Sequence, residues 1–239
     1  MLVQREAGLL EVTGTETDRA KAGISAADIA AGMYAYSGIL AALFARERTG
    51  DGATLEVAML DALGEWMSQP VSQAVYSGAA PKRTGARHAS ISPYGPFRAS
   101  DGNVFLSIQN NREWVRLCEL VLRTPTLAAD VRFSTNSRRV IHDAELVELI
   151  NVRLEAMTSD EVVALLDDAG IANAHIRTPS EFAAHPQLAA RERWRDVATP
   201  AGMVSALLPP LQVEGLEAAM GSVPTLGEHT ATVRREVGK

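Results

Sequence analysis

An uncharged run of 17 residues, from Ile29 to Ala45, constrains the fold of this chain more than any other feature of its sequence. Large apolar residues recur along it at helical spacing and small residues form a second stripe, which predicts a helix that is buried on two sides. A transmembrane helix needs about 20 mainly apolar residues, and the many alanines and glycines suit packing against protein better than contact with lipid. We therefore predict a buried helix in a cytoplasmic protein, without a membrane as partner. The large residues are Ile29, Met33, Tyr36, Leu40 and Leu43 or Phe44, and the small ones are Ala31, Ala35, Gly38, Ala42 and Ala45.

Both ends of this predicted helix carry recognisable signals. Ser25 and Asp28 have the spacing of a capping box, with Asp in place of the usual Glu. Arg46 and Arg48 place cations in the last turn, where the helix dipole favours them. The turn residues 49–52, Thr-Gly-Asp-Gly, then end the helix.

Other patterned stretches mix helices with strands, which places the chain in the α/β or α+β class. Residues 78–96 interrupt them with too much Gly, Pro and Ser for a regular element, and they form the best candidate for a domain boundary or functional loop. The predicted elements are a helical or extended segment 2–12, a strand 54–59, a helix 60–77, a strand pair 97–109 that turns at 100–102, helices 112–122 and 137–157, a helix that a Thr158–Glu161 capping box opens and Gly170 ends, and a last helix 229–237.

Composition narrows the possible functions. The 239 residues are 46% hydrophobic and 22% charged, which excludes a disordered tail or a collagen-like fibre. A net charge of −6 argues against nucleic acid as a partner. The single Cys118 cannot form an internal disulfide, and no Cys/His cluster has zinc spacing, so we expect a reducing compartment and no metal. Arg5 and Glu6 interrupt the first apolar residues, so we expect no secretory signal.

Common catalytic motifs are missing from the sequence. There is no phosphate loop, no G-x-G-x-x-G after a strand, no zinc-protease helix and no G-x-S-x-G nucleophile turn. Cys118 lies in an apolar helical pattern, which favours a packed thiol over a nucleophile. The candidates that remain are one carboxylate and one loop.

The carboxylate is that of Asp28. Local pattern favours the simpler interpretation, in which Asp28 only caps the helix together with Ser25. However, it is the only charged residue between Lys21 and Arg46. A helix N-terminus stabilises a carboxylate as the anion, and a partly desolvated carboxylate can act as a covalent nucleophile.

The loop is the segment from Arg83 to Tyr94. As a plain linker it would need only its glycines and Pro93. As a mobile cover over a site, it would offer Arg87 and His88 to an anionic substrate. Local sequence leaves both interpretations open.

Several motifs, in order along the chain, resemble the class III coenzyme A transferases, the CaiB/BaiF family. They are SAADIAAGMYAYSGILAAL from Ser25, TGDGATLEVAMLDA from Thr49, GARHASISPYGPF from Gly85, DGNV from Asp101, HPQLAAR from His185 and PTLGEHT from Pro224. The resemblance implies an α/β protein with the class III CoA-transferase fold, in which a partial Rossmann-like large domain joins a small α+β domain. It divides the chain into residues 1–77 of the large domain, a linker and lid 78–96, the small domain 97–180 and a return segment 181–239.

The resemblance also implies a reaction. Asp28 falls on the family's nucleophilic aspartate, which attacks an acyl-CoA thioester to give a mixed anhydride, then an aspartyl-CoA thioester, and finally passes CoA to a carboxylic acid. Coenzyme A is then a substrate, and no cofactor is expected. The segment Gly85 to Ser92 resembles the lid that closes over this site, and its substrate-binding residues would be Gly85, Ala86, Arg87, His88 and Ser92.

Two alternatives accompany this interpretation. Related α-methylacyl-CoA racemases tend to have an acidic residue before the lid proline, where this chain has Ser92, so transfer is favoured over racemisation. In the family the nucleophile lies well into the chain, after a nucleotide-binding half, whereas here it is residue 28. We therefore expect a homodimer or a complex with a separately encoded N-terminal half, and the alternative is a truncated, non-catalytic fragment.

Overall fold

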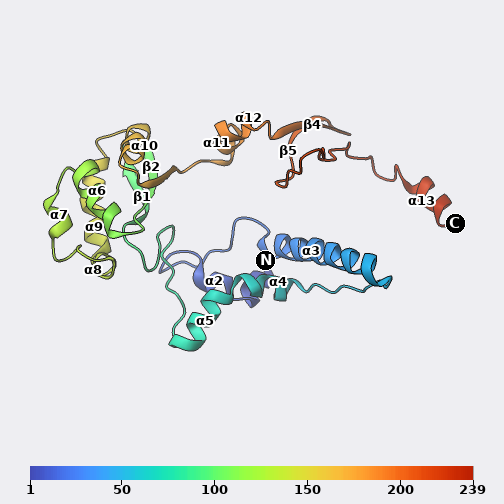
Figure 1. The fold of residues 1–239 in the computed structure, drawn as a ribbon, viewed down its shortest axis with the longest axis horizontal. Coiled ribbons are helices and arrows are strands. Elements are labelled where there is room, and N and C mark those ends of the chain that lie inside the picture. Colours follow the sequence, from blue (N-terminus) through green and yellow to red (C-terminus); the bar gives the residue numbers. More distant parts are fainter. Residues whose placement is uncertain (239) are drawn as a thin grey trace. The chain divides into compact units, whose positions relative to one another are not determined.

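The computed structural model describes residues 1–238. The chain splits into two compact units, the first Met1–Ile176 and the second from Arg177 onward. The first unit begins with five helices, and a three-stranded sheet with its own helices follows them (Figure 1). The second unit holds short helices and a hairpin. The division into family domains that the resemblance implies stays a prediction.

The first five helices are α1 (Leu2–Glu6), α2 (Leu9–Val12), α3 (Ala26–Thr49), α4 (Met59–Trp66) and α5 (Ser68–Ser77). Gly8 separates α1 from α2 because it adopts a φ of 74°, which suits glycine. The predicted strand 54–59 is absent: residues 54–58 have no regular structure, and Met59 begins α4. A strand needs a partner for its backbone groups, and no neighbouring strand lies in this part of the described chain.

Helix α3 has the predicted length but not the predicted burial. Only Ala26, Ala27 and Ala30 are buried, all at its N-terminal end, where Ala26 and Ala27 pack with Leu63 of α4. By length and composition alone the helix could cross a membrane, since its most apolar 18-residue window has a mean hydropathy of 1.4. Only 11% of that window is buried. The prediction of a helix buried on two sides was therefore wrong for this chain. The periodic pattern identifies which faces are apolar but not what covers them.

The sheet and its helices form the main hydrophobic core. Strands β1 (Tyr94–Ala99), β2 (Gly102–Ser107) and β3 (Ala172–His175) are antiparallel, in the order β1-β2-β3, and Val104 pairs with both Phe97 and His175. The strand pair with its turn at residues 100–102 confirms the prediction. Helix α9 (Asp143–Leu154) packs on β1, and α10 (Ser159–Asp168) packs on β2 and β3. Core residues include Phe97, Val104, Leu106, Trp114, Leu117, Phe133, Leu146, Ile150 and Leu166.

Shorter helices complete this unit around the sheet (Figure 1). They are α6 (Asn111–Arg116), the π-helical turn η1 (Leu117–Val121), α7 (Thr126–Ala129) and α8 (Asn136–Ile141). The helix predicted over 137–157 is therefore two helices, α8 and α9, that meet at His142. The Thr158–Glu161 capping box is present at the start of α10 as predicted.

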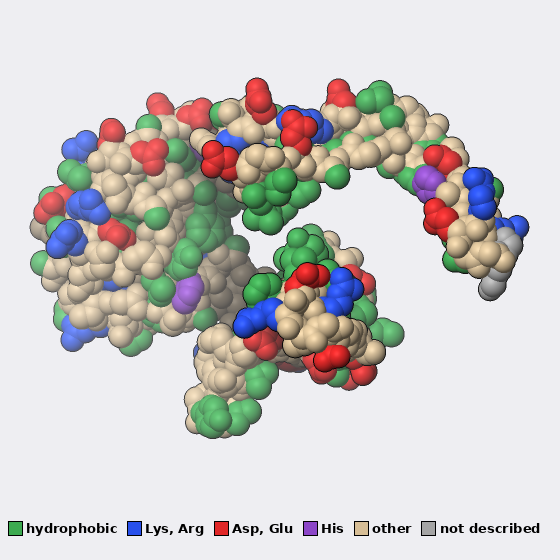
Figure 2. All heavy atoms as spheres, turned by 45° about the vertical axis from the view of Figure 1, so that its right-hand side comes forward, with side chains coloured by type: hydrophobic (Ala, Val, Ile, Leu, Met, Phe, Trp, Pro, Cys, Tyr) green, Lys and Arg blue, Asp and Glu red, His purple; other side chains and the backbone are tan. Residues whose placement is uncertain are grey.

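The second unit contains α11 (Pro179–Ala183), α12 (Pro186–Ala190) and the hairpin of β4 (Trp194–Thr199) and β5 (Gly202–Leu207). The chain ends in α13 (Thr230–Glu236), close to the predicted bounds. On the face that Figure 2 shows, acidic and basic side chains are interspersed.

Candidate active site

Asp28 lies in the first turn of α3, and its side chain is exposed. The first N–H groups of a helix have no partner within the helix, so they stabilise a nearby anion. Within residues 1–238, no hydrogen bond or ion pair engages the Asp28 carboxylate. The carboxylate is therefore open to a substrate.

The backbone around Asp28 is held firmly even though its side chain is exposed. Its helical neighbours Ala27 and Ala30 are buried. Gln4, which is 4% exposed, reaches the segment that leads into α3: its Oε1 accepts from the Ala22 N–H at 3.1 Å, and its Nε2 donates to the Ile24 carbonyl at 3.4 Å. Gln4 thus fixes the segment that leads to Asp28, a role that its sequence position alone does not reveal.

The predicted capping box at this helix does not form. Ser25 is the N-cap residue, but its side chain makes no capping hydrogen bond. Its φ of −76° and ψ of 61° lie outside the extended conformation that is usual at an N-cap. The simpler interpretation, in which Asp28 only caps the helix together with Ser25, is therefore not what the structure shows.

The predicted lid, residues 85–92, runs between α5 and β1. Gly85 has a φ of 64°, and its N–H donates to the Gly14 carbonyl at 2.8 Å. The Arg87 guanidinium donates to the Pro96 carbonyl at 2.9 Å and lies 5.0 Å from the centroid of the Phe97 ring. Gly95 is required beside it, because a Cβ there would lie 2.8 Å from Arg87 Cγ. Arg87 is consequently half-buried rather than free in solvent.

His88 is exposed and stacks on Tyr94, with ring centroids 5.0 Å apart. Its Nδ1 accepts from the Ser90 N–H at 3.1 Å, which leaves Nε2 as the ring donor in the neutral form. Ala86 is exposed, whereas Ser92 is buried at the end of the lid.

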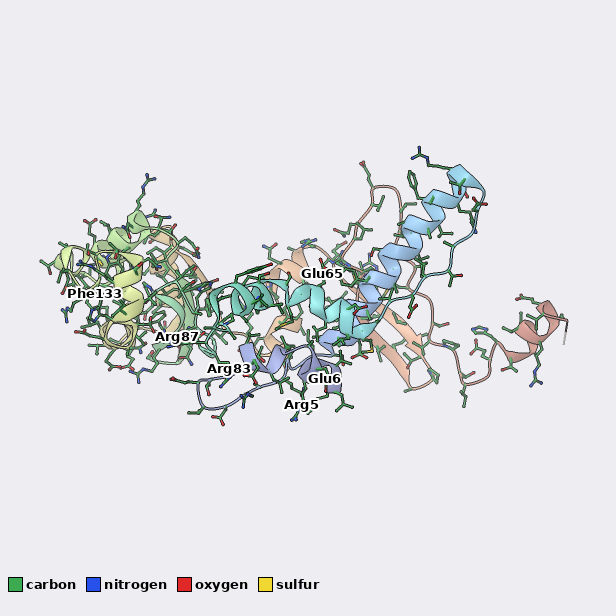
Figure 3. All side chains as sticks on the ribbon, turned by 90° about the horizontal axis from the view of Figure 1, so that it is seen from below. Arg5, Glu6, Glu65, Arg83, Arg87 and Phe133 are labelled. Atoms are coloured by element: carbon green, nitrogen blue, oxygen red, sulfur yellow. The ribbon has the colours of Figure 1, made fainter. Side chains whose placement is uncertain are left out.

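A pocket of about 580 Å³ lies beside the lid. It carries more positive than negative side chains, and Figure 3 shows where Arg83 and Arg87 lie on the connecting segment. Arg83 is committed to the backbone, since it donates to the carbonyls of Thr15 and Glu16 at 2.9 Å each. Lys82 is exposed and has no hydrogen bond or ion pair within the described chain, so it is a cation that a bound anion can reach. The charged lining residues are Lys82, Arg83, Arg87, Glu16 and Asp143.

The structure brings together some of the predicted site residues but not all. Arg87, His88 and Ser92 line the pocket. Asp28 does not, and among residues 1–238 no hydrogen bond or ion pair joins it to the lid. No group of His, Cys, Asp and Glu in this described part of the chain could hold a metal ion.

Three residues of α8 and α9 contact the lid and were missed by sequence analysis. They are Asn136, Arg139 and Asp143, all bonded to Ser90 or Ser92. They lie more than 40 positions away along the chain, so only the fold reveals the contact. A polar residue on an amphipathic helix otherwise looks like part of a solvated face.

Comparison with known proteins identifies the same family over nearly the whole chain. The family model CoA-transferase family III matches residues 1–230. Among curated proteins, an acyl-CoA transferase of Fusarium pseudograminearum is 32% identical over 238 residues, and a succinate–glutarate CoA-transferase of Agrobacterium fabrum is 30% identical over 239 residues. The matches cover 98% and 99% of this chain but only 52% and 60% of those proteins.

Solved structures agree with the sequence comparison. A CAIB/BAIF family protein from Brucella suis superimposes with a TM-score of 0.83 at 32% identity, over 98% of this chain and 61% of that one. The chain thus spans little more than half the length of the relatives it matches. With the family model over residues 1–230 and the shared fold, the chain belongs to CoA-transferase family III.

Proposed function

We propose that this chain carries the nucleophile of an enzyme that moves coenzyme A from an acyl-CoA thioester to a carboxylic acid. One observation carries the assignment to Asp28: an exposed, unpaired carboxylate at the N-terminus of a helix whose backbone is fixed by Gln4 and buried alanines. Membership of the CoA-transferase family supports the reaction class.

In the proposed reaction, a carboxylate oxygen of Asp28 attacks the thioester carbonyl carbon, and the C–S bond breaks to release CoA thiolate. The thiolate then attacks the Asp28 carbonyl of the mixed anhydride, which releases the donor acid and leaves an aspartyl-CoA thioester. The acceptor carboxylate repeats the exchange in reverse and regenerates the free carboxylate. No proton is required at any step, so the site needs to exclude water more than it needs a general base.

Relatives suggest the kind of acid. Their names include succinate–glutarate, acetyl-CoA:oxalate and succinyl-CoA:mesaconate CoA-transferases, all of which handle a dicarboxylic acid. The net positive pocket beside the lid is the place where a second carboxylate would meet Lys82 and Arg87. We therefore propose dicarboxylic acids as substrates.

The proposal also concerns the part of the relatives that this chain does not match. Helix α3 exposes apolar side chains along most of its length, and such surfaces mark contacts with other protein. We propose that the active form is a dimer or a complex that includes the rest of the family fold.

A trapping experiment tests the role of Asp28. The chain is incubated with succinyl-CoA, alone and together with the N-terminal half of a family relative, and is then treated with borohydride or hydroxylamine. We expect a mass shift on the peptide that contains Asp28, and none in Asp28→Asn. The matched control Asp61→Asn alters another exposed aspartate in a first helical turn, that of α4, and should keep the adduct. Transfer of CoA to glutarate without any adduct at Asp28 would contradict the mechanism.

A further inference from the structure

Ser92, the last residue of the lid, has every polar group bonded to helices α8 and α9. It is 1% exposed. Its N–H donates to Asn136 Oδ1 at 3.2 Å, its hydroxyl donates to Asp143 Oδ1 at 2.6 Å, and its carbonyl accepts from Arg139 Nε at 2.7 Å. Asn136 Nδ2 also donates to the Ser90 carbonyl at 2.8 Å. This end of the lid is therefore fixed by side chains from outside the loop.

Arg139 is the member of this network whose charged side chain is buried. Its side chain is 1% exposed, and within the described residues no carboxylate lies in ion-pair distance of it. Instead the guanidinium donates to Ser92 O, to Phe133 O at 3.0 Å and to Asn111 Oδ1 at 3.3 Å, and its Cζ lies 5.1 Å from the Trp114 ring centroid. Burial lowers the pKa of Arg139 from its ordinary value.

A buried cation without a counter-ion depends on the geometry of its neutral acceptors and, here, on the Trp114 ring beside it. The planar fork of arginine reaches three acceptors at once, which a lysine cannot do. Of the three, Phe133 O belongs to a buried core residue, Asn111 is the exposed first residue of α6, and Ser92 O belongs to the lid. Arg139 therefore ties the lid to the rigid core.

The other end of the lid is tied elsewhere. Arg83 bonds to the carbonyls of residues 15 and 16, and the Gly85 N–H bonds to Gly14 O. The lid thus spans two anchors, one on the segment before α3 and one on α8 and α9. Between these anchors, Arg87 bonds to the Pro96 carbonyl and His88 stacks on Tyr94, so the two anchors and β1 together set where these side chains stand.

We infer that Arg139, with Asn136 and Asp143, acts as a positioning group that holds the lid in register over its pocket. In this inference they act through the lid and not on a reacting atom. They set where Arg87 and His88 stand, and their effect on catalysis, but not their effect on the lid itself, rests on the proposed function.

Hydrogen–deuterium exchange of the full chain tests the inference. Asn136→Ala removes two bonds to the lid, and Arg139→Lys removes the fork but keeps the charge. We expect amide exchange in residues 84–92 to accelerate roughly tenfold in both variants, as the loss of one or two buried hydrogen bonds implies. Exchange in α10 should stay unchanged. Trypsin should then cut faster after Arg83 and Arg87.

The controls are the exposed neighbours Ser137→Ala and Arg138→Lys, which should leave lid exchange as in the parent chain. If Arg139→Lys fails to fold, Asn136→Ala decides the matter, since its side chain is only partly buried. Lid exchange unchanged in Asn136→Ala, or acceleration spread equally over α10, would overturn the inference.

A kinetic measurement separates this inference from the proposed function. In a preparation that transfers CoA, loss of lid position should raise KM for the acceptor acid about tenfold, with a smaller change in kcat. A parent protein that transfers no CoA would count against the proposed function, and the exchange result would still decide the role of Arg139.

Discussion

Cys118 illustrates, at the scale of one residue, how burial decides what an ionisable group can do. It lies in η1 with no exposed surface, and desolvation raises the pKa of its thiol to about 12. Because the thiolate is the reactive form, the fold keeps this thiol inert. The apolar helical pattern around it predicted a packed thiol, and the structure confirms this.

We expect Cys118 to resist labelling by a thiol reagent such as DTNB at pH 8, and to react once when the chain is unfolded in guanidinium. Because the folded pKa is raised, this group favours folding below its ordinary value of 9.0, and that contribution is lost as the pH rises from 9 toward 12. A Ser137→Cys variant, exposed on α8, should react at once and serves as the positive control. Rapid labelling of Cys118 in the folded chain would contradict its burial.

Asp28 and Arg139 differ in how far the sequence alone identifies them. Sequence pattern singled out Asp28, because a lone carboxylate before a long uncharged run is conspicuous. It gave no reason to select Arg139, one of two adjacent arginines on α8. Only the fold buries one of them and leaves the other at the surface.

At the scale of elements, two helix starts with similar sequences behave differently. Thr158 and Glu161 form both hydrogen bonds of a capping box, whereas Ser25 makes no capping bond to the turn that holds Asp28. A capping motif predicts the helix start correctly in both places. Whether its bonds form depends on the backbone angles at the cap, which the preceding segment sets.

Because only one of the two caps forms its bonds, replacing the N-cap residue by alanine should lower the free energy of unfolding by different amounts at the two helices. Thr158→Ala should lower the free energy of unfolding by about 1 kcal/mol, the usual value of an N-cap bond. Ser25→Ala should change it by less than about 0.5 kcal/mol, because no side-chain bond is lost. Urea unfolding followed by circular dichroism measures both. A larger loss for Ser25→Ala would show that its hydroxyl caps α3 in solution.

Other elements were predicted only in part, for physical reasons. The β1–β2 hairpin was predicted because its turn and alternation are local signals. The strand expected over 54–59 was wrong because strand formation depends on a partner from elsewhere in the chain. The break between α8 and α9 at His142 was missed because helical periodicity continues across it.

At the scale of the whole molecule, the exposed apolar side chains of α3 are the most conspicuous feature. Eight large ones are at least 36% exposed: Ile29, Met33, Tyr34, Tyr36, Ile39, Leu40, Leu43 and Phe44. Such a continuous surface is rare on monomeric soluble proteins. An exposed apolar surface is expected where a chain matches only 52% to 61% of the length of its relatives.

We expect the isolated chain to bind the hydrophobic dye ANS and to self-associate on a sizing column. Met33→Glu combined with Phe44→Glu should weaken both effects and change the free energy of unfolding by less than about 1 kcal/mol, since both side chains are exposed. Val152→Glu, which alters an exposed apolar residue on α9, should leave both effects in place. A parent chain that is monomeric and binds no dye would show that α3 is covered in solution.

The sequence by itself determined the family, the long apolar helix, the hairpin and the carboxylate at residue 28, because each depends on residues close together in the chain. The tertiary structure alone decided which apolar faces are covered, which arginine is buried and how the lid is held. Those outcomes depend on contacts between distant segments, such as Arg139 with Ser92 and Gln4 with Ala22. The period of a helix or strand determines the direction in which a side chain points, whereas its burial depends on which other segments pack against that face.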